Sequence, residues 1–311
     1  MPEGILLIGG TGFVGRSLLA RLHSIFPEIY TIARGNSNLK GYPNVYHHQA
    51  SLDNSVLLKK LLPLCRVVFH LASETTPGSS VLQPALEATN NLLPSLRFLE
   101  CLQEYSHLSL IYVSTGGAIY GDSENEKVSE DTPLSPLSYY GAGKAALEKF
   151  ICAYTRQTGN KAMILRPSNF YGPGQVCKEG FGIIPSIFNH LLQGETLEVW
   201  GDGTTTRDYL YIDDFVDYCL ILLRNLSLEN GVVKIYNIGS GKGTTLLELI
   251  SKVEEITGRA ILRNFHPARK VDVKRIVLDN SRINSSFSWS AQTDLQTGLK
   301  KTWEWFRTHQ T

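Results

Sequence analysis

The sequence is poor in cysteine, has no long apolar run and carries no excess of charge of either sign. Its five cysteines are scattered without Cys-x-x-Cys spacing, which favours free thiols in a reducing cytoplasm over disulfides or a zinc site. The longest apolar stretches, such as 219–223, are too short to span a membrane. A net charge of +1 gives no general attraction to nucleic acid or to an anionic membrane. We therefore expect a soluble, cytoplasmic protein without a metal site and without a nucleic-acid or membrane partner.

The chain also lacks the features that separate independent domains. No Pro/Ser-rich linker, low-complexity tract or internal repeat interrupts it, and its first ten residues lack the cationic segment of a signal peptide. At 311 residues it can bury a large core. We expect one large α/β domain or two lobes that pack directly on each other.

Short β-rich runs alternate with longer amphipathic stretches through the first half of the chain. With nearly continuous apolar strands, this alternation predicts a Rossmann-type α/β fold, a doubly wound parallel sheet with helices on both faces. The expected strands are 4–8, 28–33, 45–49, 66–71, 109–113 and 161–165, and the expected helices are 14–25, 55–62, 84–105 and 140–158. Ligands bind such sheets at the carboxyl ends of the strands.

The pattern loosens after about Arg166 into loops, isolated strands and helices. Helices are expected at 185–193, 213–225, 246–257 and 295–306, with Thr244 or Thr245 as the N-cap of the third. We therefore expect a dinucleotide-binding domain at residues 1–166 and a smaller C-terminal α/β lobe at residues 167–311, with the chain free to cross back between them.

Tyr140 and Lys144 are the most informative pair of residues in the chain. Four apart on an expected helix, they share one face, so that the phenol and the ammonium lie side by side. A nearby cation favours the phenolate, so the pair predicts a lowered pKa for Tyr140 and a role as an acid/base near neutral pH. Tyr139 lacks this spacing, and we expect it to pack against its neighbours.

A glycine-rich turn, Gly9-Gly10-Thr11-Gly12-Phe13-Val14-Gly15, follows the first expected strand and opens the first helix. The glycines at 9, 12 and 15 permit a tight turn and a close approach of the backbone to a pyrophosphate at the helix N-terminus. The turn predicts a dinucleotide site. Together with Tyr140 and Lys144 it indicates a nicotinamide-dependent redox enzyme.

The end of the second expected strand leaves the choice of dinucleotide open. An acidic residue usually stands there to hold the ribose hydroxyls of NAD, but this strand ends Ile32-Ala33-Arg34-Gly35. Arg34 is either a solvated loop cation or a residue that accommodates the 2′-phosphate of NADP. Ser51-Leu52, where an Asp often precedes the apolar residue, leaves the same question open.

Hydroxyls at the end of the fifth strand complete a recognisable group. Thr115, with Ser114 as the second choice, could hydrogen-bond the substrate oxygen that is oxidised, and with Tyr140 and Lys144 it resembles the Ser/Thr–Tyr–Lys triad of extended short-chain dehydrogenases/reductases. Further matching segments are 165–175, 201–214, 236–241, and 269–273 with Asp279. Over nearly its whole length, the chain resembles the UDP-glucose 4-epimerase-like (NAD-dependent epimerase/dehydratase) family.

This resemblance implies a role for each matching residue. Tyr140 would take the hydroxyl proton as hydride leaves the same carbon, and Lys144 would stabilise the phenolate and hold the nicotinamide ribose. The implied cofactor-binding residues are Gly9, Gly12, Phe13, Val14, Gly15, Arg34, Ser51, Leu52, Leu71, Ala72, Asn91, Ser114, Tyr140, Lys144 and Ser168. Residues 167–311 would bind a nucleotide-diphosphate sugar, with substrate contacts at Thr115, Asn169, Arg207, Tyr209, Arg269 and Asp272. The two arginines suit a diphosphate because their planar forks match its oxygens in pairs.

Three departures from the family bear on the activity. Dehydratases of the family carry Asp-Glu after the catalytic hydroxyl, whereas Gly116-Gly117 stands here and argues against dehydration. Gly143 replaces the serine often seen before the lysine, a change expected to have no consequence. Ile276 stands where a bulky Tyr excludes N-acetylated sugars in some epimerases, so that N-acetyl substrates remain open.

The sequence thus predicts a nucleotide-sugar 4-epimerase that acts on a UDP-hexose or UDP-N-acetylhexosamine through a transient 4-keto sugar. Tightly bound NAD is the expected cofactor, and NADP is possible because of Arg34. The alternative is an NAD(P)H-dependent nucleotide-sugar 4-ketoreductase with the same triad, and a dinucleotide-sensing regulator is a third. Polysaccharide precursor synthesis suits the family, whose members often dimerise through the helices that correspond to 84–105 and 140–158.

Overall fold

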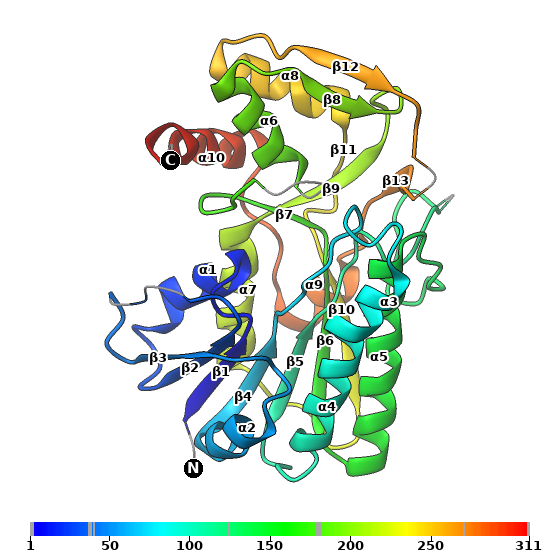
Figure 1. The fold of residues 1–311 in the computed structure, drawn as a ribbon. Helices are drawn as coiled ribbons and strands as arrows, with labels where there is room; N and C mark the ends of the chain where they lie inside the picture. The colour runs from blue at the N-terminus through cyan, green and yellow to red at the C-terminus, as the bar shows by residue number, and fades with distance from the viewer. Residues whose placement is uncertain are drawn as a thin grey trace.

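A large parallel sheet organises the computed structural model, which describes residues 3–36, 39, 41–123, 125–177, 182–269 and 271–309. Within these residues the sheet has seven strands in the order β10-β6-β5-β4-β1-β2-β3 (Figure 1). The strands are β1 (Gly4–Ile8), β2 (Ile29–Ala33), β3 (Val45–Gln49), β4 (Cys65–His70), β5 (Ser109–Val113), β6 (Lys161–Pro167) and β10 (Val233–Ile238). The expected Rossmann-type fold is therefore confirmed.

Helices cover both faces of this sheet (Figure 1). Successive side chains of a strand point to opposite faces, so Ile5 and Leu7 pack into one apolar cluster and Leu6 and Ile8 into another. The first cluster lies against α1 and α7, and the second against α2, α4 and α5. These helices are α1 (Phe13–Leu22), α2 (Ser55–Leu61, continued by a 3₁₀ turn at Leu62–Leu64), α4 (Leu93–Leu102), α5 (Tyr139–Thr158) and α7 (Ile212–Arg224).

The helix expected at 84–105 is not continuous. The structure has α3 (Pro84–Glu87), a π-helical turn (Ala88–Leu92) and then α4, which ends at Leu102. Pro94 stands near the start of α4. Proline has no N–H to donate and its ring crowds the carbonyl four residues earlier, which accounts for the irregular turn before it.

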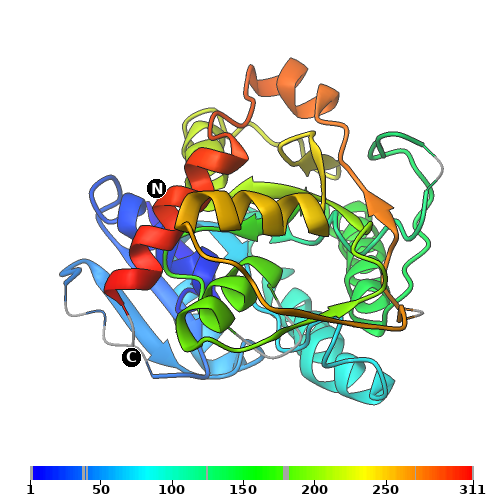
Figure 2. The same ribbon diagram turned by 90° about the horizontal axis from the view of Figure 1, so that it is seen from above.

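A smaller lobe stands beyond the carboxyl ends of the large sheet (Figure 1). One small sheet has the order β11-β9-β13 with β7 also paired to β9, and β8 pairs with β12. Figure 2 shows α8 and α10 side by side above these strands. The elements are β7 (Asn169–Tyr171), α6 (Ile183–Gln193), β8 (Leu197–Trp200), β9 (Thr206–Tyr211), β11 (Gly243–Thr245), α8 (Leu246–Thr257), β12 (Arg263–His266), β13 (Arg275–Ile276) and α10 (Leu295–Thr308).

The chain crosses between the two lobes more than once. Strand β10 pairs in parallel with β6 although it follows much of the small lobe in sequence, and α9 (Ser281–Phe287) packs on β10. Thr245 caps α8 through a capping box with Glu248, as one of the two expected threonines. Among the described residues, no helix is both long and apolar enough to cross a membrane.

Candidate active site

The glycine turn connects β1 to α1 at the carboxyl edge of the large sheet. Gly9 has φ +88°, and a Cβ there would lie 2.8 Å from the backbone nitrogen of Ala72, which follows β4. A Cβ at Gly15 would lie 2.5 Å from Gly10 Cα, so the turn packs directly on the first turn of α1. The helix begins at Phe13 with Gly12 as its N-cap. The free N–H groups at this helix N-terminus suit the pyrophosphate of a dinucleotide.

Arg34 follows β2 and is paired with a carboxylate. Its Nε lies 2.5 Å from Glu74 Oε1, in the segment after β4, and the backbone N–H of Glu74 donates to Asn91 Oδ1 at 2.8 Å. The second carboxylate oxygen, Glu74 Oε2, is buried without a hydrogen-bond partner among the described residues. Glu74 therefore brings to this edge of the sheet the acidic group that β2 lacks.

The remaining residues expected at the cofactor lie after successive strands. Ser51 and Leu52 follow β3, and Ser51 Oγ donates to Asp53 Oδ1 at 2.5 Å. Leu71 and Ala72 follow β4 and are half-buried. Ser168 follows β6, and its buried Oγ has no hydrogen-bond partner within the part of the chain that is described. Together with Glu74, this hydroxyl is a polar group that a bound dinucleotide could satisfy, so that the residues at the strand ends fit such a cofactor.

Tyr140, Lys144 and Thr115 meet where α5 begins beside the end of β5. Ser138 caps α5 by accepting a hydrogen bond from the N–H of Gly141 at 3.1 Å. Lys144 Nζ lies 5.8 Å from the centre of the Tyr140 ring and donates to the carbonyl of Val113 at 3.3 Å. Thr115 lies close enough to the Tyr140 phenol to act on its pKa. The three side chains predicted to act together are thus brought together.

The electrostatics of Tyr140 differ from the expectation. Burial and, next, the charge of Glu87 raise the pKa of the phenol to about 12, against the smaller opposing effect of the Thr115 hydrogen bond. Burial lowers the pKa of Lys144 to about 8, while Glu87 and Glu148 act to raise it. The predicted lowering of the Tyr140 pKa is therefore wrong for the free protein, because desolvation of the charged form outweighs the nearby cation.

Two neighbours of this group also depart from expectation. Tyr139 is 45% exposed as the first residue of α5, so it does not pack as predicted. Glu87 is buried, with 4% of its surface exposed, and was not singled out from the sequence. In the sequence Glu87 stands out only as an acidic residue four positions before Asn91, in a stretch whose pattern is typical of an amphipathic helix.

The predicted substrate residues lie on the small lobe and at its junction with the large sheet. Arg207 and Tyr209 are two apart on β9 and share a face, and Tyr209 is the register partner of Asn169 on β7. Burial and the nearby Arg269 lower the pKa of Arg207, whereas Tyr209 and Asp272 act to raise it. The residues predicted to hold the diphosphate and the nucleotide therefore lie close together.

Arg269 is more exposed than Arg207 and already has partners. Its Nε and Nη2 donate to the two carboxylate oxygens of Asp272 at 2.8 and 3.0 Å, and its guanidinium lies 5.4 Å from the centre of the Trp200 ring. Trp200 in turn stacks on His266 at 4.7 Å. This aromatic group, absent from the predicted set, lines the same part of the small lobe as Arg269.

The glycines after Thr115 leave no room for larger side chains. A Cβ at Gly117 would lie 2.5 Å from Asn169 Oδ1, and a Cβ at Gly116 would lie 2.6 Å from Leu278 Cδ1. An Asp-Glu pair could not be placed at these positions without moving both neighbours. Ile276 is buried in a small apolar cluster on β13.

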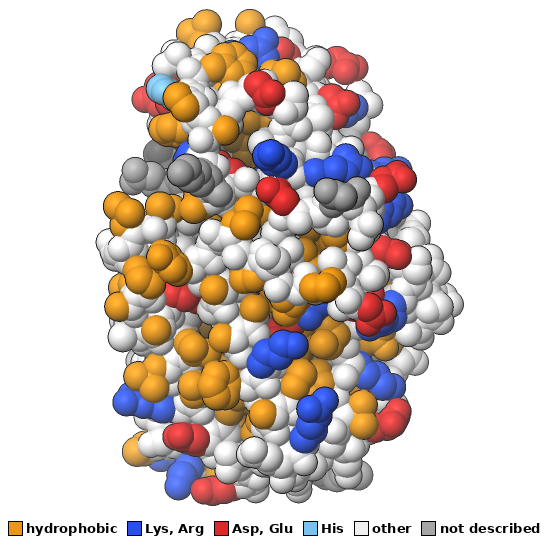
Figure 3. All heavy atoms as spheres, turned by 90° about the vertical axis from the view of Figure 1, so that its right-hand side faces the viewer, with side chains coloured by type: hydrophobic (Ala, Val, Ile, Leu, Met, Phe, Trp, Pro, Cys, Tyr) orange, Lys and Arg blue, Asp and Glu red, His pale blue; other side chains and the backbone are white. Residues whose placement is uncertain are grey.

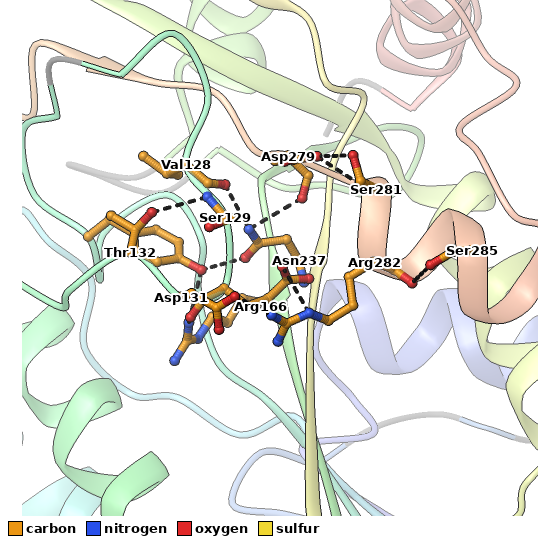
Figure 4. A network of polar contacts seen from close by, with 12 residues as sticks. Val128, Ser129, Asp131, Thr132, Arg166, Asn237, Asp279, Ser281, Arg282 and Ser285 are labelled. Atoms are coloured by element: carbon orange, nitrogen blue, oxygen red, sulfur yellow. Dashed lines mark hydrogen bonds and ion pairs between the residues drawn. The ribbon is translucent and has the colours of Figure 1, made fainter.

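Several residues of the matching segments serve the architecture instead of the site. Arg166 pairs with Glu148 at 2.6 Å and donates to the carbonyl of Glu130 at 3.1 Å. Asn237 Nδ2 donates to the carbonyl of Val128 at 2.9 Å (Figure 4). Arg282 Nη2 donates to Asp131 Oδ2 at 2.6 Å, and both residues are labelled in Figure 4. These contacts tie β6, β10 and α9 to the segment 128–132.

Comparison with known proteins places this geometry in a family. The UDP-glucose 4-epimerase of Mycolicibacterium smegmatis is 32% identical over 97% of this chain and 98% of that protein. The dTDP-4-dehydro-6-deoxyglucose reductase of Escherichia coli is 28% identical over 96% of each. The crystal structure of the Thermus thermophilus UDP-glucose 4-epimerase complex with NAD superposes with a TM-score of 0.89 at 30% identity, over 98% of this chain and 99% of that one.

A model of the NAD dependent epimerase/dehydratase family matches residues 5–239, which span the glycine turn, the Thr115–Tyr140–Lys144 group and all of β10. This family match and the alignment with a relative above 30% identity, which covers 97% of the chain, together include the residues that carry the resemblance. The chain belongs to the NAD dependent epimerase/dehydratase family of extended short-chain dehydrogenases/reductases.

Proposed function

We propose that the protein is a nucleotide-sugar 4-epimerase that acts on a UDP-hexose or UDP-N-acetylhexosamine with tightly bound NAD. The observation that carries the proposal is the meeting of Tyr140, Thr115 and Lys144 at the strand ends, opposite the Arg207 and Arg269 cluster of the small lobe. The first group provides acid/base chemistry on a sugar hydroxyl, and the second provides paired donors for a diphosphate.

NAD fits the residues at the strand ends better than NADP. The helix N-terminus at Gly12-Phe13 would hold the pyrophosphate, and Glu74 would accept a hydrogen bond from a ribose hydroxyl through its buried Oε2. Arg34 Nε pairs with Glu74 Oε1 at 2.5 Å, and the negative charge of Glu74 at this place disfavours a 2′-phosphate. When bound, NAD accepts a hydride from the sugar and returns it.

The chain's own residues would move the proton. Thr115 orients the reacting hydroxyl beside Tyr140. The Tyr140 phenolate takes the proton as the 4-keto sugar forms, and the phenol gives it back after the sugar has turned. The phenol is protonated near neutral pH in the free protein, so the base form needs positive charge beside it. Lys144 supplies that charge at 5.8 Å from the ring. No acid/base pair follows Thr115, in keeping with epimerisation over dehydration.

A nucleotide-sugar 4-ketoreductase is the second candidate. A Tyr140 pKa of about 12 keeps the phenol protonated, as a proton donor to a ketone must be. The similarity to the Escherichia coli dTDP-4-dehydro-6-deoxyglucose reductase supports the same alternative. The two candidates share the cofactor and the triad and differ in whether reducing equivalents stay in the site.

A homodimer in the cytoplasm accords with the surface and the thiols. Exposed apolar side chains gather on the face that includes α5 and the start of α4 (Figure 3), among them Phe150 at 47%, Tyr139 at 45% and Leu93 at 44% exposure. Such a face suits packing against a second copy. All five cysteines are free, as is usual in a reducing compartment. A role in polysaccharide precursor synthesis would suit such an enzyme.

Incubation of the purified protein with UDP-glucose, UDP-galactose and their N-acetyl counterparts, without added cofactor, tests the proposal. NMR of the products should show interconversion at C4 in at least one pair, and denaturation should release NAD. The opposite result is no interconversion together with stoichiometric NADPH-dependent reduction of a 4-keto sugar nucleotide. That result would establish the reductase instead.

A further inference from the structure

Glu87 is a carboxylate held in place under the catalytic group. It ends α3 and has 4% of its surface exposed. Its Oε2 accepts hydrogen bonds from Thr75 Oγ1 and from Asn91 Nδ2, the latter at 2.9 Å. Asn91 lies in the π-helical turn Ala88–Leu92, an irregularity that is often found at functional sites. Two donors from separate segments thus fix a buried charge.

Gly143 is the residue that makes room for this carboxylate. A Cβ at Gly143 would collide with Glu87 Oε1 and would lie 2.6 and 2.7 Å from Glu87 Cγ and Cδ. The contact reaches the inner part of the side chain, so the serine common before the lysine in this family could not be accommodated by rotating one terminal oxygen. The glycine at 143, expected to have no consequence, is therefore coupled to the acid at 87.

Glu87 and Lys144 line the same small cavity. It has a volume of about 10 Å³, close to the space that one water molecule needs, and it is also lined by Gly143, Asn91 and His70. The other carboxylate that acts on Lys144, Glu148, is already bound by Arg166 in a buried pair at 2.6 Å. Glu87 is therefore the carboxylate near Lys144 that has no arginine partner among the described residues, and it acts on Lys144 across their shared cavity, without a direct ion pair.

We propose that Glu87 is a positioning residue that serves as the counterion of Lys144, in a site that Gly143 opens for it. The inference deepens the proposed function, because it rests on Tyr140 and Lys144 being the catalytic pair. A negative charge at this place favours the protonated forms of both groups. It holds the lysine as an ammonium despite burial, and it makes the Tyr140 phenolate a stronger base once formed.

The other titratable groups that face Glu87 do not change charge in the working range of pH. His70, on β4, is kept neutral because burial and, next, Lys144 lower its pKa to about 3. Tyr112, on β5, is kept neutral because burial raises its pKa well above the usual value, with Glu148, Tyr140 and Glu87 acting in the same direction. The effect of Glu87 on the pH profile therefore runs through Tyr140 and Lys144.

The pH dependence of epimerisation tests the proposal. Activity requires the Tyr140 phenolate together with the Lys144 ammonium, so the pKa values of both groups bound the pH profile of kcat/KM. Glu87 raises both pKa values. In Glu87→Gln we expect both limbs to move to lower pH, each by about one unit. A uniform loss of activity at every pH, with neither limb displaced, would overturn the proposal and leave Glu87 a structural residue.

Two measurements independent of turnover separate failure of this inference from failure of the proposed function. Lys144 can be titrated by NMR in protein labelled with ¹³Cε-lysine, its signal being assigned by its loss in Lys144→Met. The midpoint should fall by about one unit in Glu87→Gln. If the Lys144 midpoint is the same in Glu87→Gln and in the wild type, the counterion role is rejected, even if the protein turns over no nucleotide sugar. If the wild type is inactive but the Lys144 midpoint falls in Glu87→Gln, only the proposed function is rejected.

The coupling of positions 87 and 143 has its own test. Gly143→Ser should lower the thermal midpoint, and Glu87→Ala combined with Gly143→Ser should recover most of that loss because the collision is removed. Equal midpoints for Gly143→Ser and the wild type would refute the packing argument. The double variant also removes the charge while filling the space, so it carries the pH experiment if Glu87→Gln folds poorly.

Discussion

Opposite charges lie near each other at two places in the molecule that differ in burial. Lys144 and Glu87 lie beneath the strand ends, and Arg269 and Asp272 lie on the small lobe. The first two residues are 6% and 4% exposed, whereas the side chains of the second two are 42% and 24% exposed. In the buried set, burial lowers the pKa of the cation by a large amount, to about 8 for Lys144. Desolvation of the buried ammonium lowers this pKa more than the neighbouring carboxylates raise it.

Arg207 stands between these two cases. It lies on a strand within the small lobe, where burial lowers its pKa, and its Nη1 donates to the carbonyl of Thr206 at 3.0 Å. No acidic side chain of the described residues forms an ion pair with it, unlike Arg269. An unpaired, partly buried guanidinium is the better anchor for an anionic ligand, because binding satisfies a charge that the folded protein leaves without a partner.

The largest effect should come from the buried catalytic group. Tyr140→Phe removes the acid/base while keeping the ring, and kcat should fall by about 10³-fold, within the usual range for such a group. Steady-state kinetics with the preferred nucleotide sugar measure it. Tyr139→Phe is the matched control, since that side chain is 45% exposed, and it should retain turnover. Full activity of Tyr140→Phe would mean that the chemistry takes place elsewhere.

Arg207 and Arg269 should differ in how much each contributes to the affinity for UDP. Arg207→Met should weaken UDP binding by roughly 10- to 100-fold, the value of a lost charged hydrogen bond. Arg269→Met should have a smaller effect, because Asp272 already satisfies that guanidinium. Calorimetric titration with UDP makes the comparison, and Arg263→Met, an exposed residue that pairs with Glu254, is the control. A larger loss of UDP affinity in Arg269→Met than in Arg207→Met would contradict the expectation that the unpaired, more buried arginine is the stronger anchor.

The Arg34–Glu74 ion pair is a third pair of opposite charges, at the edge of the large sheet where the dinucleotide is expected. Glu74→Gln frees Arg34 and removes a negative charge, so the affinity for NADP relative to NAD should rise by about 10-fold. Binding of both dinucleotides to cofactor-depleted protein measures this ratio. Arg34→Gln should leave the preference for NAD intact. An unchanged ratio in Glu74→Gln would show that the pair does not govern cofactor choice.

The smallest effect concerns stability. The Lys144 pKa falls from 10.5 to about 8 on folding, so the buried ammonium destabilises the protein fully below pH 8 and this penalty vanishes as pH rises toward 10.5. Lys144→Met removes this penalty but also leaves Glu87 without its counterion, so the difference in thermal midpoint between variant and wild type should favour the variant more at pH 7 than near pH 10, while turnover falls. Calorimetric scans at the two pH values are the measurement. Equal gains at both would exclude a charge effect.

Much of the fold could be predicted because its signals are local. The strands of the first half were expected within a residue or two of their observed bounds, since alternating apolar runs and glycine turns are read over a few residues. The helix at 84–105 was predicted as one segment, because the effect of Pro94 on the turn before it is not visible in an amphipathic pattern. Strand β10 was missed because its partner β6 is distant in sequence.

The sequence by itself determined the Rossmann-type fold, the glycine turn and the spacing of Tyr140 and Lys144, all of which depend on neighbours within a turn or a strand. Only the tertiary structure decided which acids lie beside these residues, since Glu87 reaches Gly143, and Glu74 reaches Arg34, through the packing of separate segments. It also decided the direction of the Tyr140 pKa. That direction depends on the balance between desolvation and charge, and burial is a property of the folded chain as a whole.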